Sequence, residues 1–302
     1  MPDRSNLRRA IFVAGPTSAG KSRVALDWAK RCGGEIVNAD AFQLYREFPV
    51  VSAQPPADAR AEVPHHLFGC IPCREQMDAV RYAGLALDAI AGIASRGLIP
   101  FIVGGSGLYL QALTAGLPDL PDIDPAIRDA VRAMTLQDLV ARLRELDPAS
   151  LPAIDLHNPR RVARRLELCL QTGSPASEVL TRPDPPDELR GIVLTRDRDD
   201  LNARIDGAVR ARLSGGAIDE VRAARPVAGA TARQILGWRE ITAFLDGETT
   251  LDECRDKLAA ATRRYAKRQL TWFRGKCSFP VLNLSSVKPD HMDRLSRQLG
   301  LP

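Results

Sequence analysis

The feature that most constrains this chain is an eight-residue segment near its N-terminus, which matches the pattern G-x-x-x-x-G-K-[ST]. A short apolar run, Ile11 to Ala14, precedes the segment, and a helical pattern, Arg23 to Arg31, follows it. Strand, glycine turn and helix are the context that a phosphate-binding loop requires, because backbone N–H groups and the helix N-terminus then point at one anion. The segment predicts a diphosphate or triphosphate site built by Gly15, Pro16, Thr17, Ser18, Ala19, Gly20, Lys21 and Ser22, with the Ser22 hydroxyl as a ligand of Mg²⁺.

Further apolar runs continue the alternation of strand and helix. Glu35 to Asn38 and Ile99 to Val103 are strand-like, and a helical pattern from Met77 to Ser95 separates them. Gly191 to Thr195 resembles one more strand. This order predicts an α/β fold in which a parallel sheet that carries the phosphate loop is flanked by helices.

The middle of the chain has a different composition and pattern. Prolines and aspartates follow Leu113, and helical patterns then cover Ile127 to Arg144 and Pro159 to Gln171. A second group of prolines, at 183, 185 and 186, precedes the last strand. We therefore expect a small helical insertion at 113–190 within a core made of 1–112 and 191–302, whose C-terminal part is mostly helical.

Positive charge is concentrated in two places, although the net charge is only +5. Six cations and no acidic residue lie between Ala261 and Lys276, together with Tyr265 and Trp272. In the insertion, Arg161, Arg164 and Arg165 share a face of the predicted helix because they stand at i, i+3 and i+4. Cations mixed with stacking rings are typical of RNA binding, and a solvated helix face is the alternative interpretation.

The loop alone does not fix the chemistry. A nucleotide hydrolase or kinase usually adds a second apolar strand that ends in an acidic magnesium ligand, but Ile99 to Val103 ends in glycines and Ser106. The strand that leads to a carboxylate is Glu35 to Asn38, followed by Asp40. Asp40 is therefore a candidate general base or a candidate magnesium ligand, and the bound phosphate need not be a nucleoside triphosphate.

Other patterns point to a reduced, cytoplasmic protein. No apolar run approaches the roughly 20 residues that span a bilayer, and the N-terminus has no signal-peptide pattern. Cys70 and Cys73 form a single C-x-x-C near His65 and His66, which makes a metal site conceivable. Because no second pair follows, we interpret these cysteines as ordinary residues.

Five segments, in order, resemble those of the bacterial tRNA dimethylallyltransferase family. The first resembles N-A-D-S-x-Q-x-Y, the second V-P-H-H-L, the third V-G-G-T-G-L-Y, the fourth D-P-x-R-x-x-R-x-L-E and the fifth A-T-R-x-x-A-K-R-Q-x-T-W-x-R. In this chain they begin at Asn38, Val63, Ile102, Asn158 and Ala261, and with the phosphate loop they span about residues 11 to 275. Three positions depart from the family pattern: Ala41 replaces a serine, Gln54 a lysine and Asn158 an aspartate.

The resemblance implies a specific reaction. The family transfers the dimethylallyl group of dimethylallyl diphosphate to N6 of the adenosine just 3′ of the tRNA anticodon, with Mg²⁺ at the donor diphosphate. By resemblance, Asp40 is the general base, Lys21 and Ser106 complete the catalytic set, and Arg239 joins the phosphate loop at the donor. The expected contacts to the tRNA anticodon stem-loop are Asp40, Ala41, Phe42, Gln43, Ser106, Arg128, Arg160, Arg161, Arg164, Arg263, Lys267 and Arg268. A monomer is expected.

Three other functions share some of these features. A prenyltransferase that acts on free AMP or ADP would use the loop and the carboxylate without an RNA-binding insertion. A small-molecule kinase, or an RNA-binding P-loop ATPase, would hold ATP in the loop instead.

Overall fold

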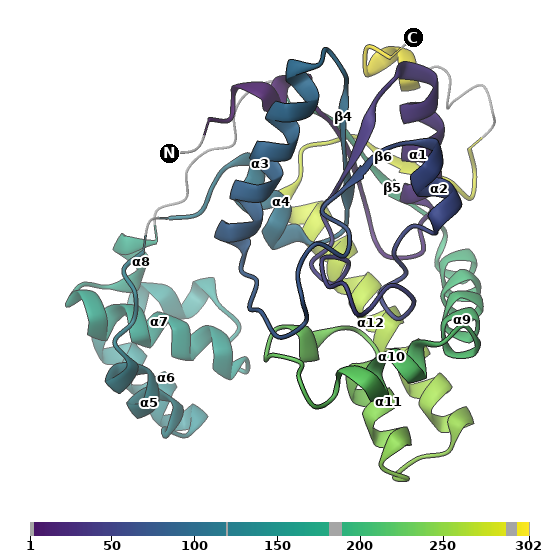
Figure 1. Cartoon of the computed structure of the whole chain (residues 1–302). Helices are drawn as coiled ribbons and strands as arrows, with labels where there is room; N and C mark the ends of the chain where they lie inside the picture. Colours follow the sequence, from purple (N-terminus) through teal and green to yellow (C-terminus); the bar gives the residue numbers. More distant parts are fainter. Residues whose placement is uncertain (1–2, 119, 181–188, 288–294, 302) are drawn as a thin grey trace. The chain divides into compact units, whose positions relative to one another are not determined.

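The computed structural model describes residues 3–118, 120–180, 189–287 and 295–301. The chain forms two compact units, one made of Met1–Thr114 and Pro186–Pro302 and the other of Ala115–Pro185. The larger unit contains a six-stranded parallel sheet in the order β3-β2-β4-β1-β5-β6 (Figure 1). Its strands are β1 (Ile11–Ala14), β2 (Glu35–Asn38), β3 (His65–His66), β4 (Pro100–Gly104), β5 (Arg190–Thr195) and β6 (Val281–Asn283). The predicted α/β class with a parallel sheet is confirmed.

Helices cover both faces of the sheet. Helix α1 (Lys21–Cys32) lies on one face, and α3 (Ala79–Ser95) and α4 (Gly107–Thr114) lie on the other (Figure 1). Strands β1 and β4 are buried along their whole length, as expected for central strands of a parallel sheet. Between β1 and α1, Ile11 and Val13 pack in one apolar cluster with Trp28.

The carboxyl ends of three neighbouring strands meet at one edge. Ala14 of β1 pairs with Gly104 of β4, and Asn38 of β2 pairs with Val103. The phosphate loop, the Asp40 loop and the glycine-rich loop after β4 therefore leave the sheet side by side, which is where α/β proteins hold ligands.

The C-terminal part of this unit is helical, as predicted. It consists of α9 (Arg198–Ser214), α10 (Ala217–Ala224), α11 (Trp238–Leu245) and α12 (Leu251–Lys276). A capping box between Thr250 and Glu253 starts α12, and Arg274 and Lys276 stand in its last turn, where cations interact favourably with the helix dipole. Shorter helices are η1 (Ser5–Arg9), α2 (Ala57–Glu62) and η3 (Ala232–Gln234).

The smaller unit is a helical cluster with its own apolar core. It contains α5 (Pro125–Arg132), α6 (Leu136–Leu146), η2 (Pro148–Ala153), α7 (Pro159–Thr172) and α8 (Ala176–Val179). The single helix predicted over Ile127 to Arg144 is wrong. Thr135 interrupts it, because its side chain accepts the Asp138 N–H as the N-cap of α6. The prolines at 183, 185 and 186 lie outside the described residues.

Two further observations complete the fold. Strands β3 and β6 were not predicted, because segments of two and three residues are too short to show an alternating pattern. None of the helices in the described part of the chain is both long enough and apolar enough to cross a bilayer.

Candidate active site

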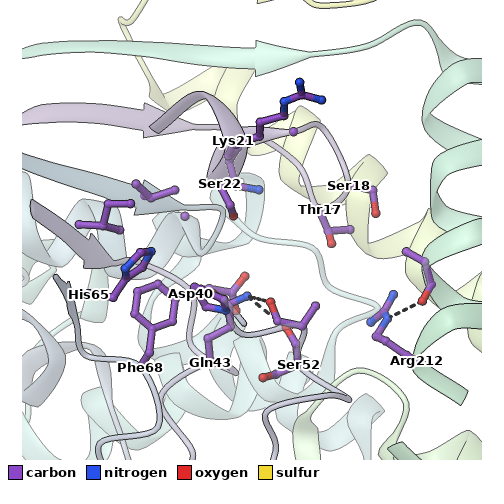
Figure 2. A pocket seen from close by; sticks show the side chains of 18 of the residues that line it. Thr17, Ser18, Lys21, Ser22, Asp40, Gln43, Ser52, His65, Phe68 and Arg212 are labelled. Carbon is purple, nitrogen blue, oxygen red and sulfur yellow. Dashed lines mark hydrogen bonds between the residues drawn. The ribbon is translucent and has the colours of Figure 1, made fainter. Parts of the chain in front are cut away.

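A cavity of about 270 Å³ opens at the carboxyl end of the sheet. The phosphate loop, the loop after β2 and helix α9 all contribute to it (Figure 2). The side chains that matter for its chemistry are Ser22 and Lys21 at the start of α1, Asp40 after β2, and Arg204 and Arg212 on α9. Five of the eight predicted phosphate-loop residues thus lie in one cavity with Asp40, namely Thr17, Ser18, Gly20, Lys21 and Ser22.

Cations hold the carbonyl side of the phosphate loop. Lys21 Nζ donates to the carbonyl of Pro16 at 2.8 Å, Arg204 Nε to that of Ser18 at 2.9 Å, and Arg196 Nε to that of Ala19 at 2.9 Å. These bonds occupy carbonyl groups of the loop, and the N–H groups at the beginning of α1 remain available to bind an anion.

Glycine is required at the start of the loop for two reasons. Gly15 has φ +141°, in a region that L side chains rarely adopt. A Cβ there would also lie 2.2 Å from the carbonyl oxygen of Leu194 in β5. The loop can therefore pass close to the sheet only with glycine at this position.

The two charged groups of the cavity perturb one another. Desolvation lowers the pKa of Lys21 to about 8, although the negative charge of Asp40 opposes this shift. Burial raises the pKa of Asp40, while the Phe42 N–H at 3.0 Å and the Lys21 ammonium act in the opposite direction. A carboxylate with a raised pKa accepts a proton more readily, which suits a general base.

Ser106 connects the Asp40 loop to helix α12. Its Oγ accepts the Ala41 N–H at 2.9 Å, and its own N–H donates to the Ala39 carbonyl at 3.2 Å. Burial raises the pKa of the Tyr265 phenol of α12, while the Ser106 side chain acts in the opposite direction. Phe42 and Tyr265 place their ring centroids 6.0 Å apart. Ser106 thus supports the loop of Asp40, and it is not one of the described residues that line the cavity.

Gln269 links α12 to two of the site loops, which the sequence interpretation did not foresee. Its buried amide accepts the Thr17 N–H at 2.9 Å and donates to the Gly105 carbonyl at 2.9 Å. A Cβ on Gly105 would lie 2.3 Å from Gln269 Nε2, and one on Gly107 would lie 2.3 Å from the Trp272 ring. The two glycines therefore let α12 pack directly on this loop. A signal was available, since Gln269 follows Tyr265 by four residues on one helix face.

Arg204 and Arg212 were also missed. They stand eight residues apart on α9, so they share a face of the helix. Arg212 donates to the Val51 carbonyl at 3.3 Å and to the Ala208 carbonyl at 3.2 Å, and burial lowers its pKa (Figure 2). The chain segment between these arginines contains another arginine outside the cavity, Arg210, so spacing alone did not single them out.

The Gln43 side chain forms hydrogen bonds within the protein. Its amide nitrogen donates to the carbonyls of Ser52 and Ala53 at 3.1 and 2.7 Å, and so ties the loop at 52–53 to the Asp40 loop (Figure 2). Gln43 also lines the cavity.

The cations predicted on α12 and α11 have different environments in the structure. Arg263 forms an ion pair with Asp206 of α9, and Lys267 is exposed. Arg268 lies over the Tyr265 ring, with its guanidinium carbon 5.6 Å from the ring centroid. Arg239 is exposed in the first turn of α11, and it is not among the described residues lining the cavity.

In the smaller unit, α7 exposes part of its arginine face. Arg160 and Arg161 are exposed, and Arg164 is exposed beside Glu167, its partner at 3.4 Å. Arg165 differs, because it is half-buried and donates to Ser150 Oγ at 2.8 Å. Arg128 on α5 is also half-buried.

Comparison with known proteins gives consistent results. The family model described as IPP transferase matches residues 43–276. A tRNA dimethylallyltransferase of Anaeromyxobacter dehalogenans is 40% identical over 97% of this chain and 98% of its own length. The crystal structure of a full-length tRNA isopentenylpyrophosphate transferase from Bacillus halodurans has a TM-score of 0.68 and is 32% identical, with 96% of this chain and 94% of that one covered. A eukaryotic dimethylallyltransferase described as acting on tRNA has a TM-score of 0.79 and is 25% identical, with 96% of this chain and 77% of that one covered. The chain belongs to the IPP transferase family of tRNA dimethylallyltransferases.

Proposed function

We propose that this protein transfers the dimethylallyl group of dimethylallyl diphosphate to N6 of the adenosine next to the 3′ side of the tRNA anticodon, and releases diphosphate. The observation that carries the proposal is the cavity in which a phosphate loop, Lys21 and Asp40 lie together, with Asp40 as the one carboxylate among its described lining residues. Family membership adds the substrate class. We expect the enzyme to act as a monomer in the cytoplasm.

The donor diphosphate would occupy the N-terminus of α1. Its charge is matched by the backbone N–H groups, by Lys21 and by Arg204 and Arg212, which sequence reasoning had not included. As the bond between C1 and the bridging oxygen breaks, these fixed positive groups stabilise the charge that grows on the departing diphosphate.

Asp40 would act on the acceptor. The N6 amine of adenine is a weak nucleophile, because its lone pair is delocalised into the ring. As N6 bonds to C1, the Asp40 carboxylate accepts the N6 proton, and no charge is left on the product nitrogen. Gln269 and Ser106 keep the loops that carry the donor and the base in register.

The residues fit a magnesium ion. The Ser22 hydroxyl lines the cavity and offers an oxygen ligand of the kind that Mg²⁺ prefers. No group of three or more His, Cys, Asp or Glu that could hold a metal occurs in the described part of the chain, so diphosphate and water would complete the coordination. When bound, Mg²⁺ neutralises charge on the leaving diphosphate.

The acceptor tRNA would be held by the exposed cations of both units. Arg160, Arg161 and Arg164 present charge on α7, and Lys267 and Arg268 do so on α12. The target base must leave its stack to reach the cavity, as for other enzymes that act on a nucleobase.

Label transfer tests this proposal. Dimethylallyl diphosphate labelled in the prenyl group is incubated with Mg²⁺ and either an anticodon stem-loop or AMP. We expect label in the stem-loop alone. Label in AMP would replace the proposal with a free-nucleotide prenyltransferase, and hydrolysis of ATP with label in neither acceptor would replace it with a P-loop ATPase.

A further inference from the structure

One wall of the candidate active site is a tight turn that contributes Ser52 and Ala53 to the cavity lining. We name residues 49–53 the wall turn. Ala53 has φ +56°, in the left-handed region that is unfavourable for a residue with a Cβ. A strained backbone conformation of this kind persists only where surrounding groups hold it. The shape of the wall turn therefore depends on contacts from other parts of the chain.

Two helices hold the wall turn at the same residue, Val51. Glu220 of α10 accepts the N–H groups of Val50 and Val51 at 2.7 and 2.8 Å, one on each carboxylate oxygen. Arg212 of α9 donates to the Val51 carbonyl at 3.3 Å. Gln43 binds the next two carbonyls of the turn (Figure 2). The carboxylate of α10 and the guanidinium of α9 thus bind the two polar groups of one backbone residue.

The short connection between α9 and α10 explains why both side chains reach this turn. Gly216, which begins α10 as its N-cap, has φ +112°, so the chain can reverse between the two helices. A Cβ on Gly215 would lie 3.5 Å from Val50 Cγ1, so the connection itself lies against the wall turn. Arg212 therefore precedes this reversal and Glu220 follows it, and the two contact the same segment.

The Glu220 carboxylate is partly withdrawn from water. The residue is half-buried, and burial raises the pKa of its carboxyl, while the N–H groups of Val51 and Val50 act in the opposite direction. Within the ranges that the structure describes, Glu220 forms no ion pair, and its hydrogen bonds go to these two N–H groups. Because water is partly excluded, removal of the carboxylate would leave both N–H groups without a full substitute.

Arg212 connects the wall turn to the donor site. Its side chain lines the cavity, and it is held by the carbonyls of Val51 and Ala208 at 3.3 and 3.2 Å. An arginine that is already fixed in one conformation loses less side-chain entropy when it binds an anion. If the wall turn were released, the Val51 carbonyl would no longer fix the guanidinium, and binding of an anion would carry that cost.

We propose that Glu220 is a positioning residue of the donor site: it fixes the wall turn through Val50 and Val51, and the wall turn holds the Arg212 guanidinium at the donor diphosphate. Glu220 is not among the described residues that line the cavity, so it acts through the turn and touches no reactant. The proposal rests on the proposed function, because that function assigns Arg212 to the diphosphate.

Binding of inorganic diphosphate tests this role without any chemistry. Isothermal titration calorimetry with Mg²⁺ measures the dissociation constant for four proteins, which are the wild type, Glu220→Ala, Arg212→Ala and the double variant. Arg212→Ala should weaken binding by about tenfold or more, as expected for the loss of a charged hydrogen bond. Glu220→Ala should weaken it by about threefold to tenfold. The double variant should bind as Arg212→Ala does, because no guanidinium is left to be positioned.

Matched variants separate positioning from general charge loss and from misfolding. Asp219→Ala removes an exposed carboxylate one residue away on α10, and it should leave the affinity for diphosphate unchanged. Glu220→Gln keeps one acceptor oxygen and should give a smaller loss than Glu220→Ala, so it replaces that variant in the cycle if the alanine protein does not fold. Hydrogen exchange of the Val50 and Val51 amides should quicken in both Glu220 variants. Circular dichroism and thermal unfolding verify that each protein is folded.

The positioning role and the proposed function can fail separately. Unchanged diphosphate affinity in the folded Glu220 variants, or in Arg212→Ala, would overturn the positioning role. A double variant whose loss equals the product of the two single losses would also overturn it, because Glu220 would then act independently of Arg212. So would an equal loss in Asp219→Ala. Absence of label transfer by the wild-type protein would overturn the proposed function and would leave the diphosphate-binding cycle intact.

Discussion

The candidate active site and a groove between α9 and α12, lined by Arg198, Arg264, Lys267 and Arg274, both gather positive charge, but they hold it differently. In the active site, Lys21 and Arg212 are held by backbone carbonyls, and desolvation lowers the pKa values of both. In the groove, Lys267 and Arg264 are exposed and unpartnered among the described residues. Fixed, desolvated charge stabilises a changing charge distribution without reorganisation, and exposed charge attracts a large anion at long range. Helix α12 contributes to both regions with opposite faces.

The largest expected effect comes from removing the base. Asp40→Ala should lower kcat by about 10² to 10⁴-fold, the usual contribution of general acid–base catalysis, while it leaves the affinity for donor largely unchanged. Label-transfer kinetics combined with donor binding by calorimetry measure this split. A variant that keeps the full rate would exclude Asp40 as the base, and one that loses donor affinity without losing kcat would favour a role as magnesium ligand.

The next effect concerns the face of α12 that supports the active site. Gln269→Leu keeps much of the side-chain volume and leaves the Thr17 N–H and the Gly105 carbonyl without their partner. Buried unsatisfied groups cost about 1–3 kcal/mol each, so we expect a lower melting temperature and a roughly tenfold or greater loss of kcat/KM. Lys257→Ala, at an exposed position of the same helix, is the matched control and should leave stability and activity unchanged. Gln269→Glu retains the acceptor for Thr17 but places a buried carboxylate oxygen against the Gly105 carbonyl, so we expect no rescue. If activity and stability survive in the leucine variant, α12 does not position these loops.

A third experiment tests the low pKa of Lys21. In the proposed function, the charged form of Lys21 binds diphosphate. Its pKa of about 8 lies below the ordinary 10.5, so the proton is lost as pH rises through about 8. Affinity for a non-reactive donor analogue should therefore fall by up to about tenfold per pH unit above pH 8. Lys21→Arg keeps its charge throughout this range and should flatten the profile. An unchanged profile in that variant would assign the pH dependence to another group.

The smallest expected effect concerns Arg263, which lines the groove and forms an ion pair with Asp206. Asp206→Ala releases Arg263 from its ion pair, and a surface pair of this kind contributes about 0.2–1 kcal/mol. We expect RNA to bind up to about fivefold more tightly at low salt, with donor affinity unaltered. Fluorescence anisotropy with a labelled anticodon stem-loop, whose target adenosine is replaced by uridine, measures this affinity. Weaker binding would show that the pair serves to hold α9 against α12.

Local sequence patterns predicted much of this architecture. The glycine-rich loop between an apolar run and a helical pattern predicted the phosphate site, because Gly15 and Gly20 are required by local backbone geometry. The strand that ends before Asp40 was identified from the short apolar run Glu35 to Asn38. The break at Thr135 was missed, since an N-cap threonine within a continuous helical pattern carries only a weak signal.

What the sequence determined by itself is therefore the set of short-range features: the loop, the strands, the helices and the charge on α7 and α12. What only the tertiary structure decided is which distant side chains meet. Gln269 forms a hydrogen bond with Thr17, from which it is 252 residues distant in sequence, and Arg204 forms one with Ser18, 186 residues distant. Periodicity reports the face of a helix but not what that face packs against, because packing depends on the whole fold. The same limit explains why the cations of α12 look alike in sequence and yet differ in the structure. Arg268 lies over an aromatic ring, Arg263 forms an ion pair, and Arg264, Lys267 and Arg274 line an open groove.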